Sequence, residues 1–221
     1  MTFEGFPDEG LVFYEGLEAD NSKTYWTGNR PVYESSVRAP MQALVDELAD
    51  EFGPAKLFRP YRDVRFSHDK TPYKTHQGAV VEPAGRSAGA WYVQISADGL
   101  RVAGGCWRLE SDQVARYRRA VVDDVQGPRL AGEVARLVGA GWELGGDRLA
   151  RSPRGIDIPD DDRADLLRHR SLNVARQWEP VDWLHTRGAL DRVRTAWRDV
   201  VALNTWMADN VGATTKEMRR R

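Results

Sequence analysis

The chain has almost no cysteine, no long apolar run and almost no net charge. Its single cysteine, Cys106, excludes an intramolecular disulfide and argues against a cysteine-based metal site. No stretch approaches the roughly 18 apolar residues that a membrane-spanning helix needs. The first residues lack the basic start and the apolar core of a secretory signal peptide. We therefore expect a cytoplasmic protein that is not held in a membrane.

Repeats, low-complexity tracts and the common motifs for nucleotides and metals are also missing. No glycine-rich phosphate-binding pattern occurs. His68 and His76 lack the spacing and the companion ligands of a metal site, so no metal is expected. His169 and His185 stand alone and are interpreted as surface or core-edge histidines. No pattern assigns a cofactor or an oligomeric state.

The net charge of −1 hides an uneven distribution along the chain. Residues 1–55 hold 11 acidic and 3 basic residues (−8), residues 56–76 hold 6 basic and 2 acidic residues (+4), and the remainder adds +3. The chain is not uniformly basic, so nucleic acid is not an expected partner. The local excess at 56–76 predicts a positive patch for a small anion. The length fits one domain over 1–215 with a frayed tail at 216–221.

Apolar spacing predicts helices at both ends of the chain. The pattern indicates a first helix over 11–17 and a second that begins at Pro40 and ends before Gly53. Two more helices are expected after Ser111, on either side of a break at Gly127. The remaining expected helices are a short one near 161–169 and one long helix over 190–207.

The clearest strand signal is an alternation of apolar and polar residues over 91–96. Asp98 and Gly99 supply a turn, and 100–107 returns as the partner strand, which predicts a hairpin. Within it, Gly104 and Gly105 indicate a bulge or tight packing, or else the close approach of a ligand.

A second hairpin is expected over 142–151 and a further strand over 172–178. Because hairpins alternate with helices, we expect an α+β fold. It would be a single domain in which several helices pack on a mostly antiparallel sheet.

The most informative segment is residues 59–76. It follows neither a helical period nor a sustained strand alternation, so core packing does not explain its composition. Ordered loops of this kind usually have a function. Arg62 and Arg65 offer planar, bidentate donors for phosphate or carboxylate, and Lys70 and Lys74 offer point charges. The segment therefore predicts a binding site for a small phosphate- or carboxylate-bearing ligand.

Hydroxyl groups and carboxylates accompany these cations. Ser67, Thr71 and Tyr73 add hydroxyls that could contact the same ligand. The alternative is that Asp63 and Asp69 pair with the cations and hold the segment in shape. On that interpretation the protein is a non-enzymatic interaction or regulatory module.

Turnover of the ligand is a further hypothesis. His68 or Asp69 could act as a general base, and Lys70 could stabilise developing negative charge. Neighbouring residues of an extended chain point in opposite directions, so the three do not form a site by sequence proximity alone. The sequence leaves open whether the protein is an enzyme.

The run of residues 62–74, RDVRFSHDKTPYK, resembles the signature of a family catalogued as domain of unknown function 2461. Similar stretches lie at 20–33, 92–107, 149–155 and 166–172, so the resemblance extends along most of the chain. Members of that family often have two asparagines where this chain has Asp-Asn at 20–21. The resemblance implies a domain extent, but no activity and no catalytic residue.

Three residues outside 59–76 complete the predicted binding surface. Asn21 and Trp26 belong to the first of the family-like stretches, and Trp107 ends the predicted hairpin. We expect them to gather around 59–76, with the tryptophans as the wall of a cleft.

Overall fold

The computed structural model describes residues 2–65, 68–82 and 88–216. The helical elements are α1 (Asp8–Ala19), α2 (Lys23–Val32), the π-helical η1 (Tyr33–Arg38), α3 (Ala39–Phe52), α4 (Ser111–Val122), α5 (Gln126–Gly139), α6 (Arg163–Leu166), the 3-10 turn η3 (Asp182–His185), α7 (Gly188–Asp199) and α8 (Val201–Asn210). The strands are β1 (Lys56–Leu57), β2 (His76–Val81), β3 (Ala90–Ser96), β4 (Gly99–Cys106), β5 (Glu143–Gly145) and β6 (Leu172–Trp178).

The predicted α+β class is confirmed. The strands form one antiparallel sheet in the order β1-β2-β3-β4-β6-β5. Backbone contacts divide the chain into two compact units, and β3, β4 and β6 contribute residues to both. Unit 1 is Met1–Val81, Tyr92–Val102 and Gln177–Ala196, and unit 2 is Glu82–Trp91, Ala103–Arg176 and Trp197–Arg221. Among the described residues, no helix is long and apolar enough to cross a membrane.

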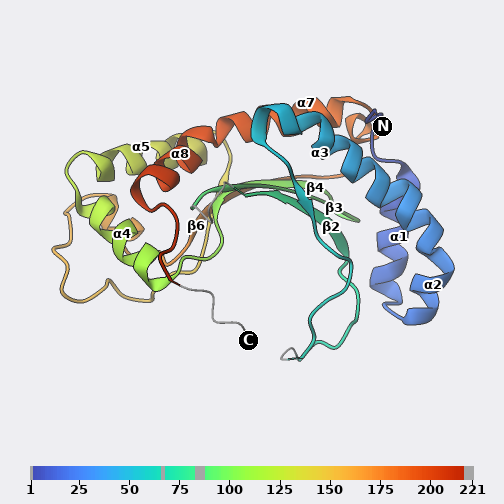
Figure 1. The fold of residues 1–221 in the computed structure, drawn as a ribbon, viewed down its shortest axis with the longest axis horizontal. Helices are drawn as coiled ribbons and strands as arrows, with labels where there is room; N and C mark the ends of the chain where they lie inside the picture. Colours follow the sequence, from blue (N-terminus) through green and yellow to red (C-terminus); the bar gives the residue numbers. More distant parts are fainter. Residues whose placement is uncertain (1, 66–67, 83–87, 217–221) are drawn as a thin grey trace. The chain divides into compact units, whose positions relative to one another are not determined.

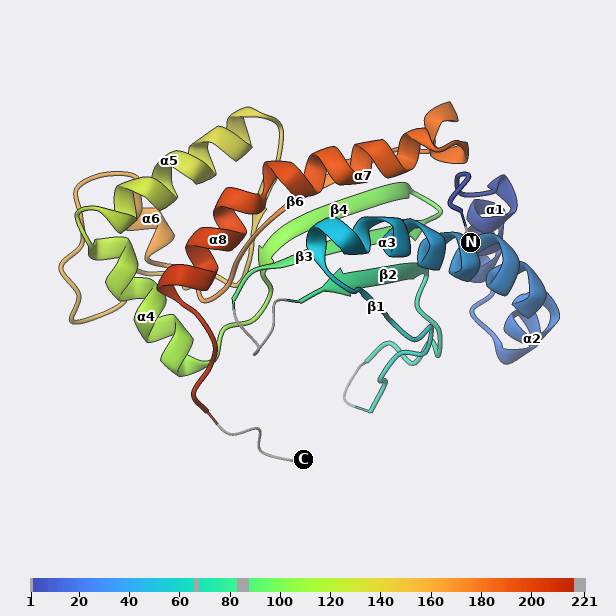
Figure 2. The same ribbon diagram turned by 45° about the horizontal axis from the view of Figure 1, so that its top comes forward.

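Unit 1 is built from the N-terminal helices and the strands β1 and β2. Figure 1 shows α1 beside α2, and Figure 2 shows α3 lying over β2. Leu17 of α1 and Leu44 of α3 are completely buried, as the predicted helical spacing requires, and both contribute to the unit's core. Ile95 of β3 is also buried, which fits the alternation predicted for this strand.

The predicted helix start at Pro40 is wrong. The chain is already helical before this residue, because α2 and η1 lead directly into α3. In η1 the N–H of Ala39 donates to the carbonyl of Glu34, five residues back. This wider turn changes the hydrogen-bond pattern just before Pro40, which has no N–H to donate. Sequence reasoning also missed α2, whose composition is polar and whose interior contains Pro31.

Unit 2 is built around α4, α5 and α8, which pack on one another (Figure 2). Tyr117 and Trp197 are completely buried in its core. The predicted hairpin over 142–151 is wrong, since β5 pairs with β6 and not with residues 148–151. The local turn signal was present, but the partner strand lies almost thirty residues further along the chain.

Two other expectations need correction. The predicted long helix over 190–207 is two helices, α7 and α8, because Val200 leaves the helical conformation with φ −95° and ψ 3°. His169, interpreted as a surface or core-edge histidine, is buried with 1% of its surface exposed, which excludes the surface alternative. The 91–107 hairpin is confirmed as β3 and β4.

The close packing indicated by Gly105 is also present. A Cβ atom at this position would lie 2.5 Å from the carbonyl oxygen of Leu172 on β6, and the glycine has φ +108°. Only a residue without a side chain fits this close approach of two strands. At the preceding Gly104, a Cβ atom would lie 2.6 Å from a methyl carbon of Val200, so both glycines make room for close packing.

Candidate functional site

The described residues 59–65 and 68–75 belong to a long excursion between β1 and β2 in unit 1 (Figure 2). Its two arms run antiparallel, because the N–H of Arg62 donates to the carbonyl of Pro72 (2.9 Å) and the N–H of Lys74 donates to that of Pro60 (2.7 Å). The arms thus form a base near the sheet and a tip away from it. The segment is therefore not one long strand, in which successive charged side chains would point to opposite faces.

An amide and two stacked rings anchor the returning arm. The side-chain N–H of Asn21 donates to the carbonyl of Tyr73, and the N–H of Tyr73 donates to the amide oxygen of Asn21, both at 3.1 Å. The Trp26 and Tyr73 rings stack with centroids 4.5 Å apart, and each residue is only 5% exposed. The predicted gathering of Asn21 and Trp26 with this segment is therefore present, in contacts that hold the loop in place.

Charges at the tip are paired within the loop. Arg65 donates through Nε and Nη2 to the Asp63 carboxylate at 2.9 and 2.7 Å, and this contact lowers the pKa of Asp63 to about 2. Arg62 donates to Asp69 and to the Thr71 hydroxyl. These pairs favour the interpretation in which the acids hold the arginines in place.

The three candidate catalytic residues lie in the same exposed tip. The pKa of Asp69 is lowered to about 2, first by the Thr71 backbone N–H, then by the Thr71 hydroxyl and by Arg62. A carboxylate with so low a pKa is a weak base at neutral pH. Lys70 donates to the carbonyl of Val64 at 3.0 Å, and His68 is exposed. Ser67 lies outside the described residues.

The base of the loop has a different character. We call Phe58, Arg59, Lys74, His76 and Tyr92 the Lys74 cluster. The Lys74 ammonium lies 5.0 Å from the centroid of the Phe58 ring, and the Phe58 and Tyr92 centroids are 6.1 Å apart. Within the described part of the chain, no carboxylate forms an ion pair with Lys74, and Arg59 acts on Asp63 only through its charge, which helps to lower the pKa of that carboxyl group.

Burial and like charge act together on this cluster. The pKa of Lys74 is lowered by partial burial and then by Arg59, and the pKa of His76 is lowered by partial burial and then by Lys74. Burial raises the pKa of Tyr92 to about 12. The lowered pKa of His76 favours a neutral imidazole at pH 7, and the raised pKa of Tyr92 favours a neutral phenol, beside the basic side chains of Lys74 and Arg59.

Gly78 makes room for one wall of the cluster. A Cβ atom at this position would lie 2.5 Å from the Tyr92 hydroxyl, so the ring covers the glycine on the neighbouring strand. Tyr92 also donates its hydroxyl to Gln94 at 2.8 Å, which fixes the ring. Sequence reasoning did not single out Phe58, and it considered His76 only as a metal ligand. The alternation of β2 was the available signal, because it places His76 and Gly78 on one face.

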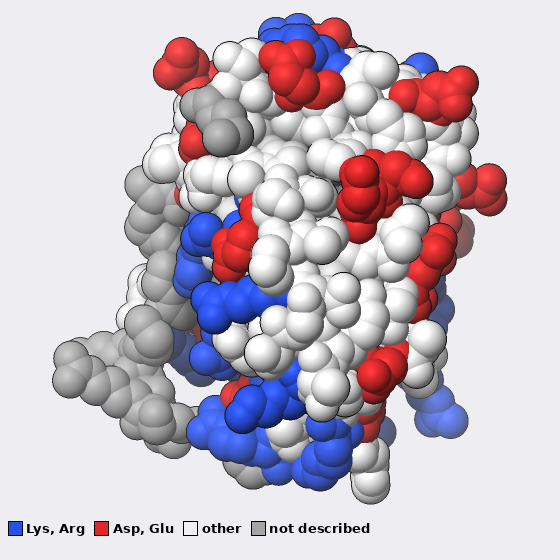
Figure 3. All heavy atoms as spheres, turned by 90° about the vertical axis from the view of Figure 1, so that its right-hand side faces the viewer, with Lys and Arg blue, Asp and Glu red and all other residues white. Residues whose placement is uncertain are grey.

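Figure 3 looks onto the face that contains α1 and α2. Lys and Arg side chains gather toward the lower part of this face, whereas Asp and Glu side chains are spread above and along its edge. The separation matches the uneven charge distribution of the sequence. It gives an anion a basic region to approach.

Trp107, the third predicted wall residue, belongs to unit 2. Its side chain is 45% exposed and lines a pocket built entirely from that unit. No group of three or more His, Cys, Asp and Glu side chains among the described residues is placed to hold a metal ion.

A family model described as "Conserved hypothetical protein (DUF2461)" matches residues 9–206. The chain belongs to this family. The DUF2461 match includes Asn21, Trp26 and all of the Lys74 cluster. Neither the curated proteins nor the solved structures include a significant match to the chain. The DUF2461 description names no activity.

Proposed function

We propose that this DUF2461 protein binds a small phosphate- or carboxylate-bearing ligand at the Lys74 cluster. The observation that supports the proposal is the half-buried ammonium of Lys74, which lies near a second cation and has no carboxylate partner among the described residues. Half-buried charges are normally compensated, and a ligand oxyanion would supply the missing charge. A cytoplasmic setting, expected from the sequence, is part of this proposal.

The neighbouring groups define what the ligand would meet. Arg59 offers a forked donor beside the Lys74 point charge, which suits an oxyanion with several oxygens. The rings of Phe58 and Tyr92 form an apolar wall for the rest of the ligand. His76, neutral at pH 7, can donate or accept one hydrogen bond. These groups support binding, and turnover of the ligand stays a prediction.

A thermal-shift screen tests the proposal. Sugar phosphates, nucleoside monophosphates and small carboxylic acids are added at constant ionic strength, with chloride as the reference. A ligand at 100 times its Kd stabilises the native state by about 2.7 kcal/mol. For a chain of this length, that raises the melting temperature by roughly 5–10 °C. If every compound behaves like chloride, the proposal is wrong.

Lys74→Met localises the site, with Lys23→Met as the matched control. Methionine keeps an unbranched stem against the Phe58 ring and removes only the charge. Lys23 is an exposed lysine in the same unit, at the start of α2. Both variants should melt near the wild-type temperature, and only Lys74→Met should lose the ligand-induced shift. An unchanged shift in folded Lys74→Met would place the ligand elsewhere.

The competing function is an interaction or regulatory module. The internal pairing of Arg62 and Arg65 favours it, as does the exposure of Tyr61, which is 48% accessible on the same loop. On that alternative the screen yields no stabilising metabolite. Arg62→Gln and Arg65→Gln would then change the structure of the loop, and the variants, like the wild-type protein, would show no ligand-induced shift in melting temperature.

A further inference from the structure

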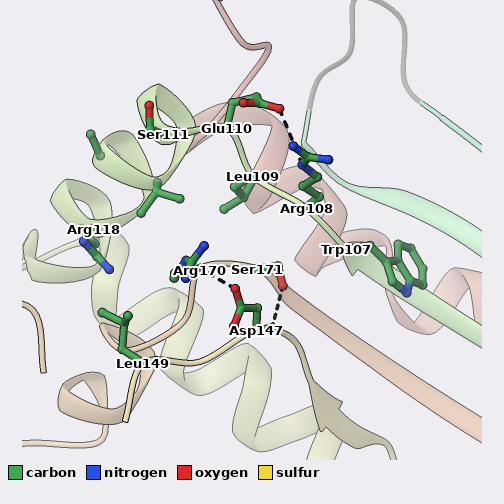
Figure 4. A pocket seen from close by; sticks show the side chains of 12 residues that line it. Trp107, Arg108, Leu109, Glu110, Ser111, Arg118, Asp147, Leu149, Arg170 and Ser171 are labelled. Carbon is green, nitrogen blue, oxygen red and sulfur yellow. Dashed lines mark hydrogen bonds and ion pairs between the residues drawn. The ribbon is translucent and has the colours of Figure 1, made fainter. Parts of the chain in front are cut away.

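Unit 2 contains a pocket that the proposed function does not use. Its volume is about 760 Å³, within the range of sites for small organic ligands. The lining comes from two stretches, residues 107–118 and residues 147–171, so the pocket lies between the start of α4 and the chain around α6. Figure 4 shows the side chains of both stretches around it.

The pocket is lined by three arginines and two acids, a net charge of +1. Two of the arginines have ion-pair partners: Arg170 lies 3.3 Å from Asp147, and Arg108 lies 3.7 Å from Glu110 (Figure 4). Glu110 is further engaged, because its side chain caps the N-terminus of α4. The excess positive charge therefore belongs to the third arginine.

Arg118 is that third arginine. It extends from α4, and among the described residues none forms an ion pair or a hydrogen bond with it. Its Nε atom is buried and has no hydrogen-bond partner within the described ranges. A buried donor without an acceptor is costly, and for a guanidinium the cost is larger than for a neutral group. An oxyanion in the pocket would supply the acceptor and the opposite charge together.

The rest of the lining suits an apolar group. Leu109 is 9% exposed, and Leu149 and Val114 are half-buried around the same space. Figure 4 shows Leu149 and Arg118 on the same side of this pocket, so one ligand could meet both the apolar surface and the guanidinium. A ligand with a single oxyanion on an apolar body therefore matches the lining better than a polyphosphate.

We propose that this pocket binds a small carboxylate or phosphate monoester whose oxyanion accepts hydrogen bonds from Arg118 while its apolar body lies against Leu109 and Leu149. The inference is independent of the Lys74 cluster, because the two sites lie in different units and share no residue.

The test uses benzoate and phenyl phosphate as probes and benzamide as the neutral counterpart of benzoate. Binding is followed by the NMR signal of the Arg118 Nε–H, which is assigned by its absence in Arg118→Gln. Benzoate and phenyl phosphate should shift this signal saturably, and benzamide should bind at least tenfold more weakly. The titration itself is done on the wild-type protein, so the signal reports on the pocket with Arg118 in place.

Arg118→Gln should weaken benzoate binding at least tenfold. Arg119→Gln is the matched control, since Arg119 is the next residue of the same helix, is exposed and does not line the pocket. Arg119→Gln should bind benzoate within twofold of the wild-type protein. Loss of binding in Lys74→Met alone would assign the probe to the other site and overturn this inference.

Three further results would also overturn it. Equal affinity for benzoate and benzamide would show that the charge on the probe does not matter. Unchanged benzoate affinity in a folded Arg118→Gln variant would exclude the arginine. An Arg118 Nε–H signal that stays in place at millimolar concentrations of both anionic probes would show that the pocket does not accept an oxyanion.

Discussion

The strongest structural prediction concerns the amide of Asn21. Asn21→Ala removes two hydrogen bonds to the backbone of Tyr73, each 3.1 Å long, and leaves that buried backbone without these partners. One such bond contributes about 0.5–1.5 kcal/mol, so the loss should be about 2 kcal/mol. For a chain of 221 residues, this lowers the melting temperature by roughly 4–8 °C.

Hydrogen exchange shows whether the loss occurs at the predicted place. In Asn21→Ala the Tyr73 amide should exchange much faster, because its acceptor is gone. Asn21→Asp retains an acceptor for this N–H and places a carboxylate next to the Tyr73 carbonyl. That variant should keep the amide protected while still losing stability.

Asn29→Ala is the matched control for this experiment. Asn29 donates one hydrogen bond, to the carbonyl of Tyr25 in its own helix, and does not contact Tyr73. This variant should cost less than about 1 kcal/mol and leave Tyr73 exchange unchanged. The reasoning fails if Asn21→Ala matches the wild-type protein in both melting temperature and Tyr73 exchange.

Two further predictions concern unit 2. Gly105→Ala should destabilise the protein by about 3 kcal/mol or more, because φ +108° and the carbonyl of Leu172 exclude a side chain. Gly132 lies in α5 with open space around it, so Gly132→Ala should raise the free energy of unfolding by about 0.5–1 kcal/mol. If urea unfolding gives the two variants the same change in the free energy of unfolding, close packing at Gly105 is not the cause of its effect. Burial lowers the pKa of His169, so below about pH 6.5 the unfolded chain binds a proton that the folded chain does not. The free energy of unfolding should therefore fall as the pH drops from 7.5 to 5.5, and His169→Gln should make this slope shallower; an unchanged slope would show that His169 does not contribute.

Local patterns predicted much of the fold. The apolar spacing of α1 and the alternation of β3 identified these elements because a single helix face or strand face is buried. The strand predicted over 172–178 is also present, as β6. These helices and strands depend on the spacing of apolar residues a few positions apart, and that spacing can be read from the sequence.

The composition of residues 59–76 also marked this segment as unusual. It allowed two interpretations of the charges, which are binding of an anionic ligand and pairing within the segment. It could not decide between them, since the pairing of Arg62 with Asp69 depends on how the loop folds back. The separation of a paired tip from a base with Lys74 likewise follows from the antiparallel course of the two arms. Composition shows which charges are present but not which ones meet.

Only the tertiary structure could decide the remaining features. β5 pairs with β6 at one edge of the sheet. A local turn signal cannot predict this pairing, because the partner strand lies about thirty residues further along the chain. The pocket beside Arg118 joins two stretches of chain, and each is unremarkable when read alone. Strand order and cavities depend on contacts between distant residues, and those contacts form only when the whole chain packs.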